Sequence, residues 1–351
     1  MTRDSSAIPA AGREQAAPPP LKPVGVRIAG TSRAVPEKRL TNFDLEKMMD
    51  TSDEWIFQRT GIRERRICDH EKGENVISLC TEALTKALAD ARMAPTELDQ
   101  LILGTVTGET VCPSTSCRVA ANVGAIGAAA FDISAACSGF VFGLNIASDM
   151  IRAGSCRTCA VIGCEVMSNI LDYSDRGVSI LFGDAAGCAI LRATDDTTKG
   201  PIASVMHADG RRWGDLYLPH KPRDVPPGVD ASKIKMHKLQ MNGREVYKFA
   251  VGTFTELIFE TLEKAGLAPD DIDMYICHQS NARMLESARE RLGIPGEKMY
   301  MNIERYGNCS SGSVPVCLSE LREQGKCRDG DLVMFVAFGA GMTWGASVWR
   351  M

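Results

Sequence analysis

The chain has 351 residues, of which 44% are hydrophobic and 24% charged, and its formal net charge is -4. This length is sufficient for two fused units of ordinary domain size, each with its own apolar layer. The slightly acidic balance, without a long basic run, argues against general affinity for nucleic acid or for an anionic membrane surface. We therefore expect any acidic partner to bind at a local basic patch.

The N-terminal residues 1–24 are rich in alanine and proline and lack the apolar segment of a signal peptide. They predict a disordered arm before the fold and a cytoplasmic protein without export. The most apolar stretch, residues 128–151, is interrupted by Asp132, Asn145 and Asp149. This pattern predicts a buried core helix rather than a membrane span.

The thirteen cysteines are spaced irregularly, without paired Cys-x-x-Cys motifs or the Cys/His spacing of zinc sites. Such usage is typical of reduced cytosolic thiols that pack as small apolar groups. His70, His207, His220 and His237 also fall outside any ligand-spaced cluster, so no metal site is predicted.

An internal duplication organises the chain. Residues 94–104 (Ala-Pro-Thr-Glu-Leu-Asp-Gln-Leu-Ile-Leu-Gly) align without a gap with residues 268–278 (Ala-Pro-Asp-Asp-Ile-Asp-Met-Tyr-Ile-Cys-His). Each copy follows a helical pattern, at residues 79–91 and 254–265, and ends in a short apolar run with strand character. Helix, turn and strand are therefore predicted twice.

The order of elements after each copy also repeats. In the first half a turn at Cys137 leads into an apolar helix and a strand, and in the second half a turn at Asn308 does the same. Apolar strands that alternate with helices predict an α/β fold with mainly parallel sheets covered by helices. We expect two such halves, residues 25–199 and 200–351, related by a pseudo-two-fold axis.

The duplication predicts that Cys137 and Asn308 are equivalent positions, each at a turn from strand to helix. His278 ends the second-half strand at the place where Gly104 ends the first. Ligand sites of α/β sheets lie outside the carboxyl ends of the strands. We therefore expect Cys137, His278 and Asn308 to share one crevice between the halves.

Cys137 has the surroundings of a nucleophile. At the start of a helix, backbone N–H groups and the helix dipole favour the thiolate and lower the pKa of the thiol. The small neighbours Ala135, Ala136, Ser138 and Gly139 leave room for a substrate carbonyl, and the Cys137 amide is placed to donate to an oxyanion. The alternative, a buried core thiol, fits the other twelve cysteines better than this one.

Other candidate residues are ambiguous when taken singly. His278 also fits a structural histidine that caps the next helix, and Asn308 fits a helix N-cap. The glycine-rich residues 338–345 either expose amides to an anion or form a tight turn. Only the combination of these residues distinguishes the alternatives.

In combination the residues resemble the β-ketoacyl-acyl carrier protein synthase III family, which are ketosynthases of the thiolase superfamily. The resemblance covers residues 25–351 and keeps the nucleophile, histidine and asparagine in family order. It implies two duplicated α/β halves in a five-layered αβαβα architecture, a homodimer, and no cofactor beyond coenzyme A or phosphopantetheine thioesters as substrates. The segments that carry it are residues 51–65, 135–140, 175–177, 182–187, 278–281, 308–311 and 338–345.

The resemblance implies an acyltransferase that performs a decarboxylating Claisen condensation in fatty-acid initiation or in a polyketide pathway. Cys137 takes an acyl group from coenzyme A or a carrier protein. His278 and Asn308 bind the thioester oxygen of a malonyl-type unit on acyl carrier protein while that unit loses carbon dioxide. The enolate then attacks the acyl-Cys137 carbonyl, whose oxyanion rests on the amides of Cys137 and Ala340.

The resemblance also implies substrate-binding roles. Trp55 stacks on the adenine of coenzyme A, Arg59 and Arg176 contact its nucleotide end, and Arg244 and Asn281 border the pantetheine path. The alternative for Trp55, Arg59 and Arg176 is an interface tryptophan with surface ion pairs.

A helix after His278 carries the residues expected to contact the carrier protein. Arg283, Arg289 and Arg291 follow the histidine on this helix and resemble the basic patch that receives the acidic carrier protein in the family. They would provide the local positive field that this slightly acidic chain otherwise lacks.

The chain departs from the family near the expected acyl pocket. Cys112 occupies a place where many bacterial members carry a phenylalanine that reaches across the dimer to floor the partner's pocket, so the smaller side chain predicts a deeper pocket. Glu109 is either a base that activates an acceptor or a solvated loop residue. The differences leave open a secondary-metabolic enzyme that joins two acyl chains, and acyl transfer to an oxygen or nitrogen acceptor without decarboxylation.

Overall fold

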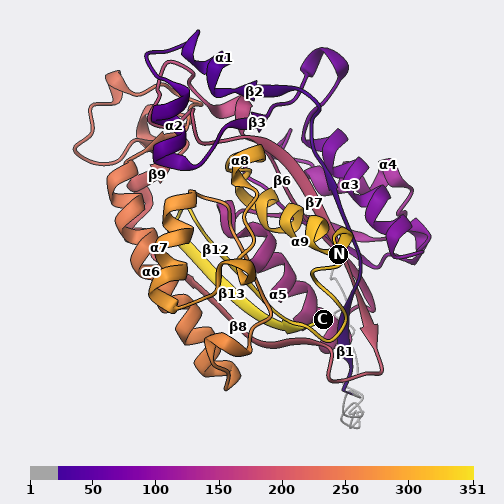
Figure 1. Ribbon diagram of the computed structural model, residues 1–351. Helices are drawn as coiled ribbons and strands as arrows, with labels where there is room; N and C mark the ends of the chain where they lie inside the picture. The colour runs from indigo at the N-terminus through magenta and orange to yellow at the C-terminus, as the bar shows by residue number, and fades with distance from the viewer. Residues whose placement is uncertain (1–22) are drawn as a thin grey trace, which may run out of the picture.

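The structure, a computed structural model, describes residues 23–351 (Figure 1). The predicted arm, residues 1–24, lies outside the described residues except for Pro23 and Val24. The first large sheet takes its strands from the first half of the chain. These strands are β1 (Gly25–Ala34), β4 (Gln100–Gly104), β5 (Ala129–Ile133), β6 (Thr158–Val166) and β7 (Asp184–Thr194), in the spatial order β1-β7-β6-β4-β5.

The second large sheet takes its strands from the second half. They are β8 (Gly200–Ala208), β11 (Met274–Cys277), β12 (Leu332–Gly339) and β13 (Thr343–Arg350), in the order β11-β12-β13-β8. Tyr275 of β11 also forms a parallel bridge with Met299, at the place that β5 holds in the first sheet. The two sheets therefore share one topology.

Six longer helices cover the sheets in three pairs. The pairs are α3 (Val76–Asp90) with α4 (Thr115–Val123), α5 (Gly139–Arg152) with α9 (Ser313–Glu323), and α6 (Gly243–Ala265) with α7 (Ala282–Leu292). Figure 1 shows α5 and α9 between the sheets, α3 and α4 outside the first sheet, and α6 and α7 outside the second. The predicted five-layered αβαβα architecture is confirmed.

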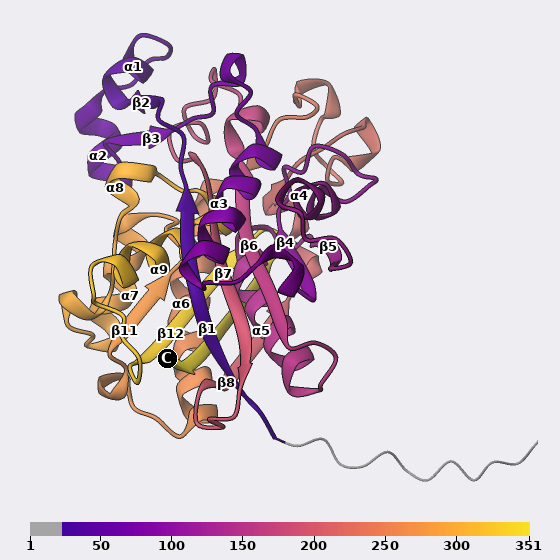
Figure 2. The same cartoon turned by 90° about the vertical axis from the view of Figure 1, so that its right-hand side faces the viewer.

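Short elements extend above the carboxyl ends of the strands, where α2 lies close to α8 in both Figure 1 and Figure 2. The Arg63 amide donates to the Glu304 carbonyl there, which joins segments from the two halves. The short elements are β2 (Arg39–Thr41), α1 (Asn42–Glu46), α2 (Asp53–Thr60), β3 (Glu64–Arg66), β9 (Leu216–Tyr217), β10 (Gln240–Met241) and α8 (Ile303–Tyr306).

The prediction of mainly parallel sheets is wrong. The pairs β1–β7, β7–β6, β8–β13 and β13–β12 are antiparallel, and only β6–β4, β4–β5 and β11–β12 are parallel. Residues 340–342 alone connect β12 to β13. A parallel pair needs a crossover of a dozen or more residues, so such a short turn permits only the antiparallel arrangement.

The duplicated segments fold alike in detail. Each opens with a 3-10 turn, η2 (Pro95–Glu97) and η8 (Pro269–Asp271). In the first turn the Glu97 carboxylate accepts from the Ala94 amide at 2.8 Å, and in the second the Asp271 carboxylate accepts from the Ala268 amide at 2.7 Å. The same side-chain cap thus sets the direction in which each duplicated segment enters its strand, β4 in the first half and β11 in the second.

One apolar core joins the halves. It contains Ile102 of β4, Leu144 of α5, Leu318 of α9 and Phe335 of β12, all fully buried. The core helix predicted at residues 128–151 is therefore present, although it begins at Gly139 after strand β5. Within residues 23–351, no helix is both long enough and apolar enough to cross a membrane.

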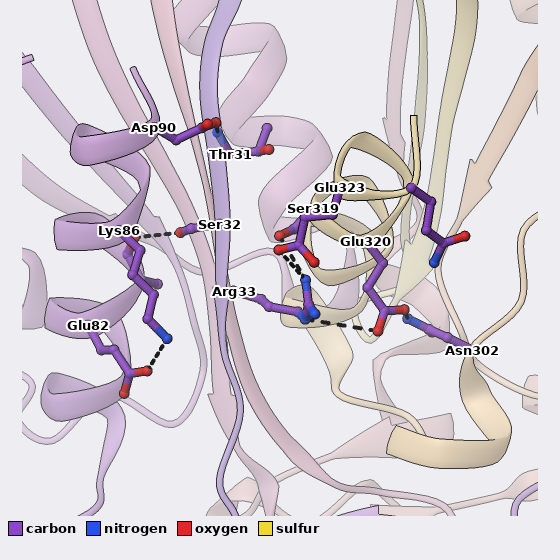
Figure 3. Close-up of polar contacts among 12 residues, drawn as sticks. Thr31, Ser32, Arg33, Glu82, Lys86, Asp90, Asn302, Ser319, Glu320 and Glu323 are labelled. Atoms are coloured by element: carbon purple, nitrogen blue, oxygen red, sulfur yellow. Dashed lines mark hydrogen bonds and ion pairs between the residues drawn. The ribbon is translucent and has the colours of Figure 1, made fainter. Parts of the chain in front are cut away.

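A polar contact between β1 and α9 also joins the halves, as Figure 3 shows. The Arg33 guanidinium lies 2.7 Å from a Glu323 carboxylate oxygen, 3.9 Å from Glu320 and 3.3 Å from the Ser319 hydroxyl. These three partners belong to α9 in the second half. The central helix is thereby fixed against the edge strand of the first sheet.

Candidate active site

Cys137 lies in the sharp turn between β5 and α5, within the 3-10 segment η3 (Ala136–Ser138). Ala136 has φ +46°, in the left-handed region that residues other than glycine seldom adopt. The end of β12 closes against this turn, because a Cβ on Gly339 would lie only 2.6 Å from the Cys137 amide nitrogen. Glycine at 339 therefore permits strand and nucleophile to be in direct backbone contact.

The same turn occurs before α9, where Ser310 has φ +48° in the 3-10 segment η10 (Ser310–Gly312). Because Ser310 corresponds to Ala136, the counterpart of Cys137 is Ser311. The predicted equivalence of Cys137 and Asn308 is wrong, since Asn308 lies earlier in the turn. The sequence repeat does not continue into this segment, so only the backbone conformation fixes the alignment.

Cys137, His278 and Asn308 line one cavity of about 280 Å³. The cysteine comes from the turn before α5, the histidine follows β11, and the asparagine lies before η10. The two halves of the chain thus contribute different side chains to a single site. Cys137 is only 7% exposed, yet it faces this cavity.

The imidazole of His278 is held by both its backbone and its ring. Its amide donates to the Val336 carbonyl at 2.8 Å, and Nδ1 lies 2.7 Å from the Ser313 hydroxyl. Burial lowers the pKa of His278 to about 3, against a weaker raising effect from the Ser310 backbone. The ring is therefore neutral at neutral pH, and Nε2 is the nitrogen left to bind substrate.

The Asn308 carboxamide is oriented by the chain around it. Its Oδ1 accepts from the Ser310 amide at 2.8 Å. Its backbone is paired with the first half, donating to Leu181 at 2.8 Å and accepting from Gly183 at 3.1 Å. With Oδ1 occupied, the Nδ2 group remains as a donor toward the cavity.

The Cys137 thiol does not have the lowered pKa that its position before a helix predicts. Burial raises its pKa to about 12, and the nearby Glu165 charge adds to this effect. The Ser310 hydroxyl, 3.3 Å from Sγ, acts in the opposite direction. Loss of water around the sulfur therefore outweighs the favourable field of the helix start.

Sequence reasoning missed Glu165, which is fully buried on β6. Its carboxylate accepts from the Thr107 hydroxyl at 2.6 Å and from the amides of Thr107 and Val106 at 3.0 and 3.1 Å. Burial raises its pKa to about 7 despite these bonds. The available signal was a single acidic residue inside the apolar run of residues 158–166.

Trp55, Arg59 and Arg176 lie together along the cavity. The Arg59 and Arg176 guanidinium carbons are 4.4 and 5.0 Å from the centre of the Trp55 ring system, within the range of cation–π contacts. Arg176 also pairs with Asp50, at 3.5 Å. The three predicted nucleotide-end residues thus form one cationic and aromatic surface.

Asn281 and Arg244 occupy different positions relative to the cavity. Asn281 lines it and caps α7, since its Oδ1 accepts from the Arg283 amide at 2.9 Å while its Nδ2 donates to the Arg59 carbonyl at 3.0 Å. Arg244 is exposed on the first turn of α6. Its neighbours Gly243 and Val246 line the cavity instead.

The three arginines of α7 are not alike. Arg289 pairs with Glu286 and donates to the Ile294 carbonyl at 2.8 Å, so its charge is largely neutralised within its own helix. Arg283 and Arg291 are exposed, and neither forms an ion pair within residues 23–351. Only these two present a free positive charge on α7.

Glu109 and Cys112 lie outside the residues that line this chain's own cavity. The Glu109 carboxylate accepts from the Val76 amide at 3.2 Å, at the first turn of α3. Cys112 is exposed in the adjoining loop. Ala340 follows Gly339 in the β12–β13 turn, and its carbonyl accepts from the Thr343 hydroxyl at 3.2 Å.

A thiol, a neutral imidazole and a carboxamide donor around one cavity define a thiolase-fold condensing enzyme, in which the thiol carries an acyl group and the two nitrogen donors bind a developing enolate. Family comparison supports this class. Residues 131–210 match the description 3-oxoacyl-[acyl-carrier-protein] synthase III, and residues 262–351 match its C-terminal part. The chain belongs to the β-ketoacyl-acyl carrier protein synthase III family and is a ketosynthase.

Individual relatives agree over nearly the whole chain. It is 46% identical to the β-ketoacyl-[acyl-carrier-protein] synthase III of Caldanaerobacter subterraneus subsp. tengcongensis, over 93% of this chain and 97% of that one. The solved synthase III of Aquifex aeolicus is 40% identical, with a TM-score of 0.85 over 93% and 100% of the two chains. The priming β-ketosynthase of the R1128 polyketide pathway is 32% identical, with a TM-score of 0.86 over 94% and 98%.

Proposed function

We propose that the chain primes an acyl chain by decarboxylating condensation of an acyl-coenzyme A with a malonyl unit on acyl carrier protein. The observation that carries this proposal is that Cys137, His278 and Asn308 line one cavity. The relatives described above, which include both synthase III enzymes and a priming polyketide ketosynthase, support the reaction class.

In the first step Cys137 Sγ attacks the thioester carbonyl and displaces coenzyme A, so the acyl group becomes bound to the enzyme. The amides of Cys137 and Ala340 are proposed to bind the tetrahedral oxyanion. The contact between Gly339 and the Cys137 amide supports this role, because it brings the β12–β13 turn next to the reacting carbon.

In the second step the malonyl thioester enters the same cavity and loses carbon dioxide. Nε2–H of His278 and Nδ2–H of Asn308 are proposed to donate to its thioester oxygen as the enolate forms. The Ser313 hydroxyl lies 2.7 Å from Nδ1 of His278 and 2.8 Å from the Ser310 carbonyl, and it supports the required tautomer when it donates to Nδ1. The enolate carbon then attacks acyl-Cys137 and releases the β-ketoacyl product.

The thioester arm is proposed to enter past Trp55. The adenine of coenzyme A would stack on this ring, with Arg59 and Arg176 beside its phosphates, while Asn281 and the first turn of α6 at Arg244 border the pantetheine. The cationic and aromatic contacts among Trp55, Arg59 and Arg176 support this assignment. The exposed Arg283 and Arg291 are proposed to receive the acidic carrier protein.

The active form is proposed to be a cytoplasmic homodimer. Within the described part of the chain β5 pairs only with β4, which leaves its outer edge open, and an open edge strand is a template for pairing with another copy. Ile126, just before β5, and Val111, in the loop before α4, are strongly exposed. If two copies of the chain paired their first sheets along β5, the Glu109–Cys112 loop of one copy would lie near the acyl end of the other copy's cavity.

Two experiments test the reaction. Intact-mass analysis after mixing the protein with a panel of acyl thioesters is expected to show one added acyl group, which is absent in Cys137→Ala. Release of carbon dioxide from malonyl carrier protein, dependent on the acyl donor, distinguishes condensation from acyl transfer to an oxygen or nitrogen acceptor. Acylation by no thioester in the panel would exclude the proposed function.

The donor panel also bears on the pathway. The R1128 priming ketosynthase supports the alternative of a polyketide starter condensation, since it is similar over 94% of this chain. A preference for donors longer than acetyl would favour that alternative, or the joining of two acyl chains, over fatty-acid initiation.

A further inference from the structure

The acyl-transfer step leaves one proton without an acceptor. Cys137 must lose its proton as Sγ attacks the thioester, yet burial makes the thiol a weak acid. The neutral His278 is bound at Nδ1 by Ser313, and within residues 23–351 no hydrogen bond joins its ring to the sulfur. The hydroxyl of Ser310 is the polar side chain that contacts Sγ, at 3.3 Å.

Ser310 also contacts a group that can hold the proton. Its hydroxyl oxygen lies 3.4 Å from Glu165 Oε1 and 3.3 Å from Cys137 Sγ. The left-handed conformation of Ser310 and the bond from its amide to Asn308 fix the position of this hydroxyl. Sulfur, hydroxyl and carboxylate therefore form a continuous chain through the wall of the cavity.

We propose that Glu165 accepts the Cys137 proton through the Ser310 hydroxyl during acylation and returns it when the condensed product leaves. This inference rests on the proposed function. As the S–C bond forms, the thiol proton passes to Ser310 Oγ while the serine proton passes to Glu165. The coenzyme A thiolate leaves and takes a proton from solvent. In the condensation, collapse of the second tetrahedral intermediate frees the Cys137 thiolate, which regains its proton by the reverse path.

The surroundings of Glu165 suit such an exchange. Five donor groups, from Thr105, Val106, Thr107 and Ser310, stabilise the carboxylate, but no lysine or arginine contacts it among the described residues. Burial and these donors oppose each other and leave the pKa of Glu165 near neutrality, at about 7. A group of this kind exchanges a proton at little cost near neutral pH.

The titratable groups facing Glu165 are few. Cys137 faces it from η3, and Cys164, its neighbour on β6, is a buried thiol whose pKa is raised further by the Glu165 charge. The residues that bond to it from the segment after β4, Thr105 and Thr107, do not titrate. A pH transition near neutrality in acylation is therefore assigned to the Glu165 carboxyl.

The alternative is a purely structural role, in which Glu165 only braces the turn after β4. Glu165→Gln separates the two roles, because the amide keeps the size and an acceptor oxygen but cannot take up a proton. Ser310→Ala interrupts the chain of contacts and leaves Glu165 in place. Asp184→Asn is the matched control, since Asp184 is a second fully buried carboxylate held by the Ser168 hydroxyl and by the amides of Ser168 and Cys68.

The test measures single-turnover acylation by an acyl-coenzyme A between about pH 5.5 and 9. We expect Glu165→Gln and Ser310→Ala to acylate about 100-fold more slowly than wild type near pH 8, with the transition near pH 7 lost in Glu165→Gln. Asp184→Asn is expected to keep the transition. Wild-type rate and pH profile in Glu165→Gln would overturn the proposal.

A second readout detects a merely structural defect. Decarboxylation of malonyl carrier protein is measured in the Cys137→Ala background, with and without Glu165→Gln. The proton transfer from Cys137 through Ser310 to Glu165 concerns only the thiol proton. The decarboxylation rates with and without Glu165→Gln are therefore expected to agree within about twofold. If Glu165→Gln lowered decarboxylation and acylation in parallel, the proposed proton transfer would be overturned. Absence of acylation in the wild type would instead refute the proposed function itself.

Discussion

The Ser311 hydroxyl donates a 2.6 Å hydrogen bond to the Gly104 carbonyl. These two residues are the counterparts of Cys137 and His278 under the pseudo-two-fold relationship. In one pair of equivalent positions Cys137 and His278 face the active-site cavity. In the other pair Ser311 and Gly104 are hydrogen-bonded directly to each other. A Cβ on Gly104 would lie 2.6 Å from the Gly139 backbone, so helix α5 packs where a second imidazole would project.

This packing predicts that Gly104→Ala destabilises the fold by about 1–3 kcal/mol, because backbone rather than a flexible side chain must move. Gly252→Ala is the control, since that glycine lies within α6 with nothing within 4 Å of its Cβ position. The control is expected to gain about 0.5–1 kcal/mol from helix propensity. Urea unfolding measures both, and equal stability of the two variants would contradict the account.

The raised pKa of Glu165 predicts a pH dependence of stability. The folded state holds the Glu165 proton up to about pH 7, whereas the unfolded chain releases it near the ordinary glutamate pKa of 4.5. The folded state therefore binds more protons in this window, and the contribution of Glu165 to stability falls as pH rises from about 4.5 to 7. Glu165→Gln should gain stability relative to wild type by about 3 kcal/mol over that range.

Urea unfolding of the two proteins at about pH 4.5 and 8 measures the difference. A stability difference that stays constant with pH would contradict the raised pKa. This measurement is independent of the acylation experiment, because it requires no substrate.

His278→Ala is expected to lower decarboxylation by about 10²–10³-fold while Cys137 still becomes acylated, since the proposed role of the imidazole is to donate to the enolate rather than to the thiol. Because the pKa of His278 is about 3, the neutral ring should produce no transition in wild-type decarboxylation above about pH 5. Carbon dioxide release and intact mass report the two steps separately. His207→Ala is the control, as this exposed histidine on β8 contacts Glu260 at 3.0 Å outside the cavity.

Cys112→Phe is expected to shift the preferred donor toward shorter chains, because added volume at the proposed dimer contact shortens the partner's acyl pocket. Acylation rates against donor chain length measure the shift, and Cys112→Ser controls for loss of the thiol at similar size. An unchanged chain-length profile in Cys112→Phe would mean that this residue does not floor the pocket.

Carrier binding should depend on the free arginines of α7. Arg283→Glu and Arg291→Glu are each expected to raise the KM for malonyl carrier protein about tenfold at low salt, and less at high salt. Arg289→Gln should have a smaller effect, since Glu286 already neutralises that charge. Kinetics measured with malonyl-coenzyme A instead of malonyl carrier protein show whether a substitution has damaged the cavity. Equal effects for all three arginines would contradict the distinction between the free Arg283 and Arg291 and the paired Arg289.

The sequence repeat predicted the architecture because its caps and apolar strands are local features. Ala94 and Ala268 begin the same turn in both halves, and an apolar strand follows each turn, ending at Gly104 in the first half and just before His278 in the second. Strand direction was predicted less well. The antiparallel pairs depend on the short β12–β13 turn and on the unpatterned segment between β6 and β7, neither of which carries a repeat signal.

The site was predictable where a residue ends a strand or begins a helix, as with Cys137 and His278. It was not predictable where burial decides the chemistry. The pKa of the Cys137 thiol depends on the residues that surround it, and some of these, including Ser310, are more than a hundred positions away in the sequence. Glu165 and Ser313 act through such long-range contacts, so their types and spacing alone gave little indication of a role.

The distribution of thiols has a consequence for covalent labelling. Cys112 and Cys117 are exposed, whereas the other eleven cysteines, including Cys137, are buried. Bulky alkylating reagents should thus modify Cys112 and Cys117 before they reach Cys137. An inhibitor that inactivates the enzyme must instead be a slender electrophile that enters the cavity lined by Trp55 and Cys137, and selectivity will depend on its cross-section as much as on its intrinsic reactivity.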